Sequence, residues 1–166
     1  MQIGIISDSH DNLPNIYKAL DYFKQRGVEQ IIHCGDISAG SVLVEISQKF
    51  DGHTDVILGN VHGGEKNMFT KAGECKNVTL HGDQAELEIG GKKIAVNHYP
   101  WEAEKLAESG RYDVVFYGHD HKAWEKTIGK TKLYNPGTLA GLFAKPTFAI
   151  YDTDSGKAEL ILIEKI

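Results

Sequence analysis

The sequence has little cysteine, little proline and no long apolar run. Its 166 residues include two cysteines and four prolines. Cys34 and Cys75 are too few and too far apart for a disulfide framework, and neither lies in a C-x-x-C motif. The first apolar run covers only a few residues and has no basic segment before it, so we expect neither a signal peptide nor a membrane helix. These features predict a soluble, cytoplasmic protein.

The sequence also lacks an excess of basic residues, and its formal net charge is -5. Proteins that hold duplex nucleic acid by its phosphates usually carry such an excess, so we do not expect a nucleic-acid partner. With 41% hydrophobic residues, the chain is long enough for one packed domain and short for two. We therefore expect a single domain over residues 1–166, which leaves a homo-oligomer possible.

The first half of the sequence alternates between short apolar runs and helical patterns. In the first helical pattern the apolar residues recur at steps of three and four, Pro14 stands early and Gly27 follows the last turn. Strands are expected at residues 3–6, 29–36 and 54–60, and helices at residues 13–23 and 41–50. This β-α-β-α-β order predicts a parallel sheet.

The second half of the sequence has a different pattern. A less regular stretch at residues 68–76 is followed by two hairpin patterns, at residues 85–98 and 148–163. A helix at residues 102–109 and a strand at residues 112–121 are expected between them. We interpret this half as β-rich and mainly antiparallel, and we expect two sheets packed face to face with helices outside.

Polar side chains stand where the expected strands end. They are Asp8, His10, Asp36, Asn60, His98, His119 and His121. Ligands of open α/β sheets bind at the carboxyl ends of the strands, so these side chains are placed to converge. Taken singly, each motif also has an ordinary explanation as a helix cap, a tight turn or a solvated loop. One shared site explains all seven together better than seven separate accidents do.

All seven side chains offer oxygen or imidazole nitrogen, and none offers a thiolate. Such a set suits manganese, iron, nickel, zinc or cobalt rather than a structural zinc knot. Seven ligands are too many for one catalytic ion, so we expect two divalent metal ions, with Mn²⁺ or Ni²⁺ favoured. Asp36 is the natural bridge between them.

The motifs D-x-H, G-D, G-N, H and G-H-x-H, in this order, resemble those of the calcineurin-like metallophosphoesterases. The short chain and its "IIHCGD" segment resemble the small prokaryotic YfcE-like phosphodiesterases, and with "NPGT" the resemblance covers nearly the whole chain. It implies an α/β fold, an αββα four-layer sandwich of two mixed β-sheets flanked by helices. It also implies one metal held by Asp8, His10, Asp36 and His121, and another held by Asp36, Asn60, His98 and His119.

The resemblance implies hydrolysis of a small aryl or nucleotide phosphodiester. In two-metal hydrolases the ions lower the pKa of a bridging water and clamp the phosphoryl oxygens. Two divalent ions beside Asp8 and Asp36 leave a net positive charge, which attracts an anionic ester. The alternatives are a phosphomonoesterase or nuclease with the same metal site, and a non-catalytic protein-interaction scaffold similar to the retromer subunit of this fold.

The sequence departs from the family pattern in two places. After the G-N motif the family commonly has either a histidine, the usual catalytic one, or a short polar residue followed by an acid. Here Val61 stands at that position, and His62 follows one residue later. We expect His62 either to serve as the proton donor beside the catalytic Asp36 and Asn60 or to face solvent. After His98, where the family commonly has glycine, stand Tyr99, Pro100 and Trp101, which either line the substrate entrance or pack at the start of the next helix.

Other chemistry-bearing residues have simpler interpretations. Asp11 is expected either to orient a ligand histidine or to cap the first helix. His33 is expected in the core or behind the site, and His53 and His81 on surface loops. Cys34 is expected to be a small buried hydrophobic residue.

Overall fold

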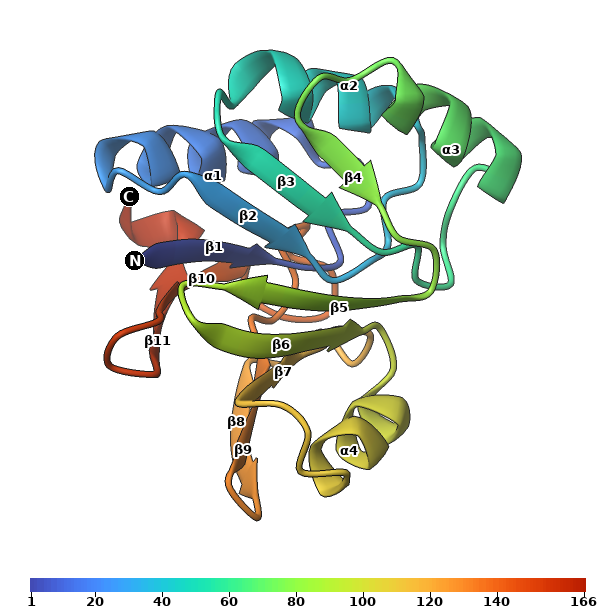
Figure 1. The fold of residues 1–166 in the computed structure, drawn as a ribbon. Coiled ribbons are helices and arrows are strands. Elements are labelled where there is room, and N and C mark those ends of the chain that lie inside the picture. The colour runs from blue at the N-terminus through green and yellow to red at the C-terminus, as the bar shows by residue number, and fades with distance from the viewer.

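The computed structural model describes residues 1–166, which form two β-sheets packed face to face (Figure 1). The first sheet has six strands, in the order β11 (Lys157–Leu162), β10 (Thr147–Asp152), β1 (Gln2–Ile6), β2 (Gln30–His33), β3 (His53–Val56) and β4 (Val78–Leu80). The second has five, in the order β5 (Gln84–Ile89), β6 (Lys92–Asn97), β7 (Val114–Phe116), β9 (Thr131–Asn135) and β8 (Trp124–Ile128).

Helices cover the outer face of each sheet (Figure 1). Those on the first sheet are α1 (Leu13–Gln25), α2 (Ser41–Lys49) and α3 (Glu65–Gly73), and the second sheet carries α4 (Pro100–Glu108). A short 3-10 helix, η1 (Ile163–Lys165), ends the chain. Both sheets mix parallel and antiparallel pairs, so the expected αββα sandwich of two mixed sheets is confirmed. None of the helices has the length and apolar character that a membrane span needs.

Three apolar clusters fill the three interfaces between these four layers. Strand β1 contributes side chains to two of these clusters, because successive side chains of a strand point to opposite faces of the sheet. Ile5 packs between the sheets, whereas Ile6 packs beneath the helices together with Phe23 of α1. A strand buried on both faces is apolar throughout, which explains the unbroken run at residues 3–6.

The first helix begins and packs as its sequence predicts. Asn12 is its N-cap, and the side-chain oxygen of Asn12 accepts a hydrogen bond from the backbone N–H of Asn15 at 3.2 Å. Pro14 stands in the first turn, where no backbone donor is needed. The buried residues recur at helical spacing and face the first sheet. They are Ile16, Ala19, Leu20 and Phe23.

The structure corrects the expectation of an irregular stretch at residues 68–76. Helix α3 occupies much of it, beginning at Glu65 and ending at Gly73. Only Met68 and Ala72 of this helix are buried, and its N-cap, Gly64, provides no side-chain hydrogen bond. Because the helix has few buried apolar residues and no capping side chain, its sequence shows only a weak helical pattern.

The second half of the chain is less antiparallel than its pattern indicated. Both predicted hairpins form, as β5–β6 and β10–β11, but β6–β7 and β7–β9 pair in parallel. The strand expected at residues 112–121 covers only Val114–Phe116, and α4 begins two residues before the expected Glu102. The β8–β9 hairpin and the short strand β4 were not predicted.

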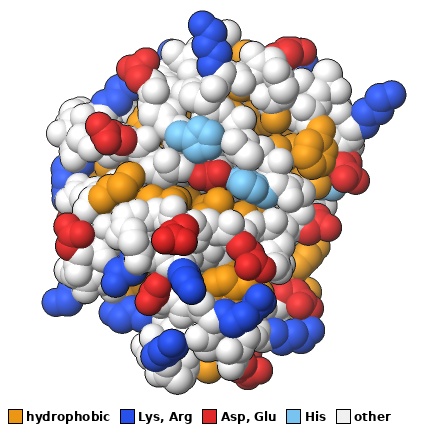
Figure 2. Space-filling model, in the orientation of Figure 1, with side chains coloured by type: hydrophobic (Ala, Val, Ile, Leu, Met, Phe, Trp, Pro, Cys, Tyr) orange, Lys and Arg blue, Asp and Glu red, His pale blue; other side chains and the backbone are white.

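Charged side chains of both signs are interspersed over the molecular face in Figure 2. Neither the basic nor the acidic side chains form a continuous stripe on this face, which is seen in the same orientation as Figure 1.

Candidate metal centre

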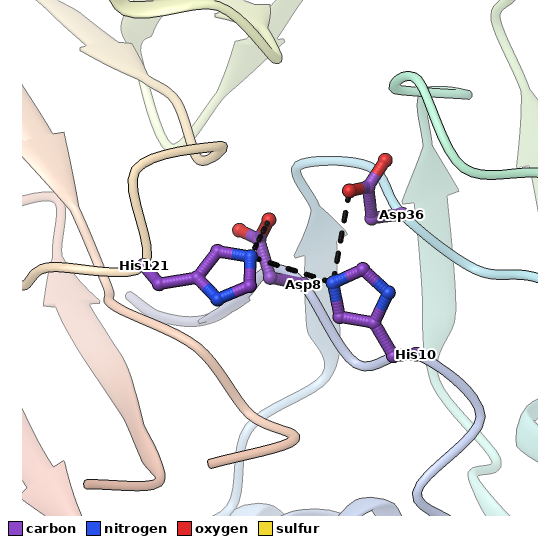
Figure 3. A group of neighbouring side chains, drawn as sticks. All are labelled: Asp8, His10, Asp36 and His121. Carbon is purple, nitrogen blue, oxygen red and sulfur yellow. Dashed lines mark hydrogen bonds and ion pairs between the residues drawn. The ribbon is translucent and has the colours of Figure 1, made fainter. Parts of the chain in front are cut away.

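Four of the predicted ligands form one compact group, shown in Figure 3. One ligand atom each from Asp8, His10, Asp36 and His121 lies within 4.8 Å of the others. Asp8 and His10 follow β1, Asp36 follows β2, and His121 lies in the loop after β7. Nε2 of His121 is 3.2 Å from Oδ1 of Asp8. Nε2 of His10 is 3.7 Å from Oδ2 of Asp36 and 3.4 Å from Nε2 of His121.

The other three predicted ligands meet at the side-chain oxygen of Asn60. Nε2 of His98 lies 3.0 Å from Oδ1 of Asn60, and Nδ1 of His119 lies 2.9 Å from the same oxygen. Oδ1 of Asp36 is 3.4 Å from Nε2 of His98. Asp36 therefore faces both groups, one with each carboxylate oxygen, which is the arrangement expected of a bridging ligand.

Two backbone carbonyls orient the histidine rings. Nδ1 of His98 lies 2.8 Å from the carbonyl oxygen of Cys34, and Nδ1 of His121 lies 3.0 Å from that of Leu142. A carbonyl oxygen only accepts hydrogen bonds, so each Nδ1 carries the proton. In the neutral ring Nε2 then presents a lone pair to the centre, as a metal-binding histidine must.

The surroundings of Asp8 and Asp36 shift the pKa values of the two carboxyl groups in opposite directions. Burial raises the pKa of Asp8, whose side chain is fully enclosed. Burial also opposes ionisation of Asp36, but the hydrogen bond and charge of His98, with the N–H groups of Val61 and Asn60, outweigh it and lower the pKa of Asp36. Burial disfavours the charged form of His98, yet Asp36 and Asp8 raise the pKa of that ring. A divalent cation that binds His98 would have to displace the proton that Asp36 and Asp8 favour on that ring.

Left-handed backbone conformations concentrate at this centre. Seven non-glycine residues have positive φ, and five of them are predicted ligands: Asp8, His10, Asp36, His119 and His121. Such conformations cost free energy and persist where the surrounding structure over-determines them, commonly at functional sites. The strand ends are thus bent to turn these side chains toward one point.

The donor set fits divalent metal ions. The oxygens and ring nitrogens that face one another are mostly acceptors, because carboxylates cannot donate and His98 and His121 have their protons on Nδ1. Close packing of acceptors is satisfied by a cation between them. Oxygen and imidazole ligands without thiolate suit Mn²⁺, Ni²⁺, Fe²⁺, Co²⁺ or Zn²⁺.

Neighbouring residues hold the loops that carry the predicted ligands. The hydroxyl of Thr138 donates to the carbonyl oxygen of Asp8 at 3.0 Å, and Nδ2 of Asn135 donates to that of Gly118 at 3.0 Å. The "NPGT" segment therefore lies behind the site. Asp11 has neither expected role, because Asn12 caps α1 and Oδ1 of Asp11 accepts from the backbone N–H groups of Ser38 and Ala39. Asp11 instead fixes the loop after Asp36.

The remaining histidines fall outside the centre. His33 is fully buried behind it, where its Nε2 lies 2.9 Å from the hydroxyl of Ser9. His53 and His81 are not simple surface residues, because their Nε2 atoms lie 3.6 and 2.6 Å from Oδ1 of the buried Asp55. His62 is half-buried, its Nδ1 has no hydrogen-bond partner, and it forms no hydrogen bond with a predicted ligand.

Aromatic side chains border the centre. Tyr99 and Trp101 stack on each other with ring centroids 4.7 Å apart, and both contact the ring of His119 edge-on. Phe143, which the sequence did not single out, lies with its ring centroid 5.6 Å from that of His121. Sequence alone offers no sign of this contact, because it depends on how the loop after β9 folds against the loop after β7.

Comparison with known proteins identifies relatives along the whole chain. Residues 1–156 match the calcineurin-like phosphoesterase superfamily domain. Phosphodiesterase MJ0936 of Methanocaldococcus jannaschii is 33% identical over 167 residues, which cover 99% of this chain and 100% of that protein.

Solved structures agree with this match. The structure of a novel archaeal phosphodiesterase has a TM-score of 0.90 at 32% identity, covering 98% of this chain and 99% of that one. The phosphoesterase YfcE of E. coli has a TM-score of 0.68 over 98% of this chain and 100% of that one, and its 16% identity restricts the likeness to the fold. The sequence motifs, the sandwich and these matches together show that the chain belongs to the calcineurin-like phosphoesterase superfamily.

Proposed function

We propose that this protein is a metal-dependent phosphodiesterase with a two-metal centre. The observation that carries the proposal is the position of Asp36, whose two carboxylate oxygens face two separate groups of nitrogen and oxygen ligands. Asp8, His10 and His121 would complete one metal site with Asp36. Asn60, His98 and His119 would complete the other.

The roles of the protein groups follow from their contacts. The buried carboxylates of Asp8 and Asp36 supply negative charge, and the carbonyls of Cys34 and Leu142 hold two ligand rings in the required tautomer. When bound, a pair of divalent ions lowers the pKa of a water molecule and neutralises the phosphoryl oxygens of the ester. The backbone N–H of Asn60 donates to the carboxylate of Asp36, which fixes the position of Asn60, a ligand of one site, relative to Asp36, the ligand common to both.

The proposed substrate is a small aryl or nucleotide phosphodiester. A relative of 33% identity is named a phosphodiesterase, which favours a diester over a monoester. The stacked rings of Tyr99 and Trp101 beside His119 offer an apolar surface to a flat leaving group. The acidic composition of the chain disfavours a nuclease, which would bind a long polyanion.

Metal removal and reconstitution test the proposal. Protein stripped with a chelator should not hydrolyse bis(p-nitrophenyl) phosphate, and Mn²⁺ or Ni²⁺ should restore activity better than Mg²⁺ because imidazole ligands suit these metals. p-Nitrophenyl phosphate, assayed in parallel, distinguishes a monoesterase. Failure of every divalent ion to restore hydrolysis of either ester would favour a non-catalytic scaffold on this fold.

A further inference from the structure

Two exposed aromatic surfaces border the candidate metal centre. The first is the aromatic pair, Tyr99 and Trp101, whose planes lie 21° apart. Trp101 is 51% exposed and meets His119 edge-on at 5.6 Å between ring centroids. The second is Phe143, which is 96% exposed and lies 5.6 Å from His121 by the same measure. The two surfaces therefore contact different predicted ligands.

The backbone of Phe143 distinguishes it from an ordinary exposed apolar residue. Its φ is +61°, a left-handed conformation that is uncommon for a bulky side chain. Of the seven non-glycine residues with positive φ, five are predicted ligands and Asp11 adjoins them. Phe143 is the seventh. Strain of this kind clusters at ligand-binding sites, where the rest of the structure holds it in place.

Specific hydrogen bonds hold the loop of Phe143 against the centre. Nδ1 of His121 donates to the carbonyl oxygen of Leu142 at 3.0 Å, so the residue before Phe143 is tied directly to a predicted ligand. Nδ2 of Asn12 donates to the carbonyl oxygen of Ala140 at 3.0 Å. The phenyl ring is thus presented to solvent by a loop that is fixed at the metal centre.

A continuous series of contacts joins Phe143 to the aromatic pair through the centre. From Phe143 it passes in order through His121, His10, Asp36, His98, Asn60 and His119 to Trp101. Phe143 contacts His121 of one predicted metal site, and Trp101 contacts His119 of the other. A phosphoryl group held between the two sites would therefore lie between ligands that each contact an exposed aromatic ring.

From this arrangement we infer that the site takes phosphodiesters that carry a flat aromatic group on both sides of the phosphorus. This inference rests on the proposed phosphodiesterase function. The aromatic pair stacks on one ester group, and Phe143 stacks on the other. The substrate class is therefore bis-aryl or dinucleoside diesters, rather than diesters with an alkyl group on one side. We call Phe143 and the aromatic pair together the clamp. Aromatic faces accept any flat ring, so the clamp selects for a flat group rather than for one particular base.

Binding of a slowly hydrolysed ligand tests the clamp independently of turnover. Isothermal titration calorimetry of the Mn²⁺-loaded protein with diphenyl phosphate should show about tenfold weaker binding for both Phe143→Ala and Trp101→Ala, as expected when one stacking contact is lost. Phe143→Trp should keep the wild-type affinity because it keeps an aromatic face. Phe69→Ala, which removes a 43%-exposed ring from α3, is the matched control and should not change affinity.

Kinetics with two diesters assign one surface to each ester group. Both Phe143→Ala and Trp101→Ala should raise the KM for bis(p-nitrophenyl) phosphate. Only one of the two should raise the KM for methyl p-nitrophenyl phosphate, because this ester has a single ring. Wild-type affinity for diphenyl phosphate in Phe143→Ala would overturn the clamp. The clamp would also be overturned if the wild type were an oligomer and Phe143→Ala were a monomer with an unchanged KM. Phe143 would then belong to a subunit interface.

These measurements separate the clamp from the proposed function. If the wild-type protein hydrolyses diesters and Phe143→Ala behaves as wild type in both assays, the phosphodiesterase stands and the clamp is wrong. If no metal restores hydrolysis but both alanine variants weaken the binding of diphenyl phosphate, the clamp stands and the phosphodiesterase proposal is wrong.

Discussion

The backbone N–H of Asn60 donates to Oδ1 of Asp36 at 2.8 Å, so one predicted ligand fixes the carboxylate of another. This bond holds the carboxylate of Asp36 in a position where it faces both groups of predicted ligands. It also explains why a glycine precedes Asn60, because the turn must approach Asp36 closely.

Asp36→Asn should remove the negative charge that serves both predicted metal sites while keeping an oxygen that accepts from Asn60. We expect diesterase activity to fall by about a hundredfold or more and both metals to bind more weakly. His10→Ala should weaken mainly one metal, because His10 faces only one group. Metal content per chain, measured by mass spectrometry after dialysis against limiting Mn²⁺, checks this. Equal metal loss in the two variants would contradict a bridging role.

Gly59→Ala should damage the metal centre specifically. Gly59 has a φ of +79°, and an added Cβ would collide with Oδ1 of Asp36 and lie 2.6 Å from its backbone nitrogen. Gly82 is a matched control, because its φ is +81° and a Cβ there would meet nothing within 4 Å. Both variants should lose about 1–2 kcal/mol of stability from the left-handed backbone. Only Gly59→Ala should also lose metal and activity, as urea denaturation and metal analysis would show.

His62→Ala tests the proton donor. Nδ1 of His62 is buried without a hydrogen-bond partner, and His62 stands two residues after Asn60 and directly after Val61. If His62 protonates the leaving group, the variant should slow alkyl esters by roughly a hundredfold and spare p-nitrophenyl esters, whose leaving group needs little protonation. Comparison of kcat for the two ester types measures this. An equal, small loss for both esters would assign His62 no catalytic role.

The buried His33 should make the metal-free protein sensitive to acid. Burial lowers the pKa of His33 from 6.5 to about 3. Between these values the unfolded chain binds a proton at His33 that the folded chain does not, so the free energy of unfolding falls as the pH falls from 6.5 toward 3. The slope from one such group approaches about 1.4 kcal/mol per pH unit.

His33→Gln should reduce that slope in the pH 6 to 4 window, as urea denaturation in the presence of a chelator would measure. The raised pKa of Asp8 acts in the opposite direction, since its folded form holds a proton more readily. Because Asp8 is present in both proteins, the difference between them reports on His33. Identical slopes would show that His33 does not contribute to acid sensitivity.

Local patterns in the sequence were enough for the layer order and for the identity of the seven converging residues. A strand such as Ile3–Ile6, buried on both faces, is apolar at every position, and the residues that follow it lie at the sheet edge whatever the rest of the chain does. The pattern failed where burial is slight, as in α3 with only two buried residues. It also could not show that β6, β7 and β9 run parallel, because strand direction depends on long-range pairing.

Contacts between distant loops were decided by the tertiary structure alone. Oδ1 of Asp11 accepts hydrogen bonds from the loop after β2 rather than capping the helix that follows it. The carbonyl of Leu142, in the loop after β9, fixes the tautomer of His121, in the loop after β7. Phe143 reaches the metal centre by the same loop packing. These residues leave no periodic or motif pattern, because a loop has no repeating geometry and its partners are set only when the two sheets pack together.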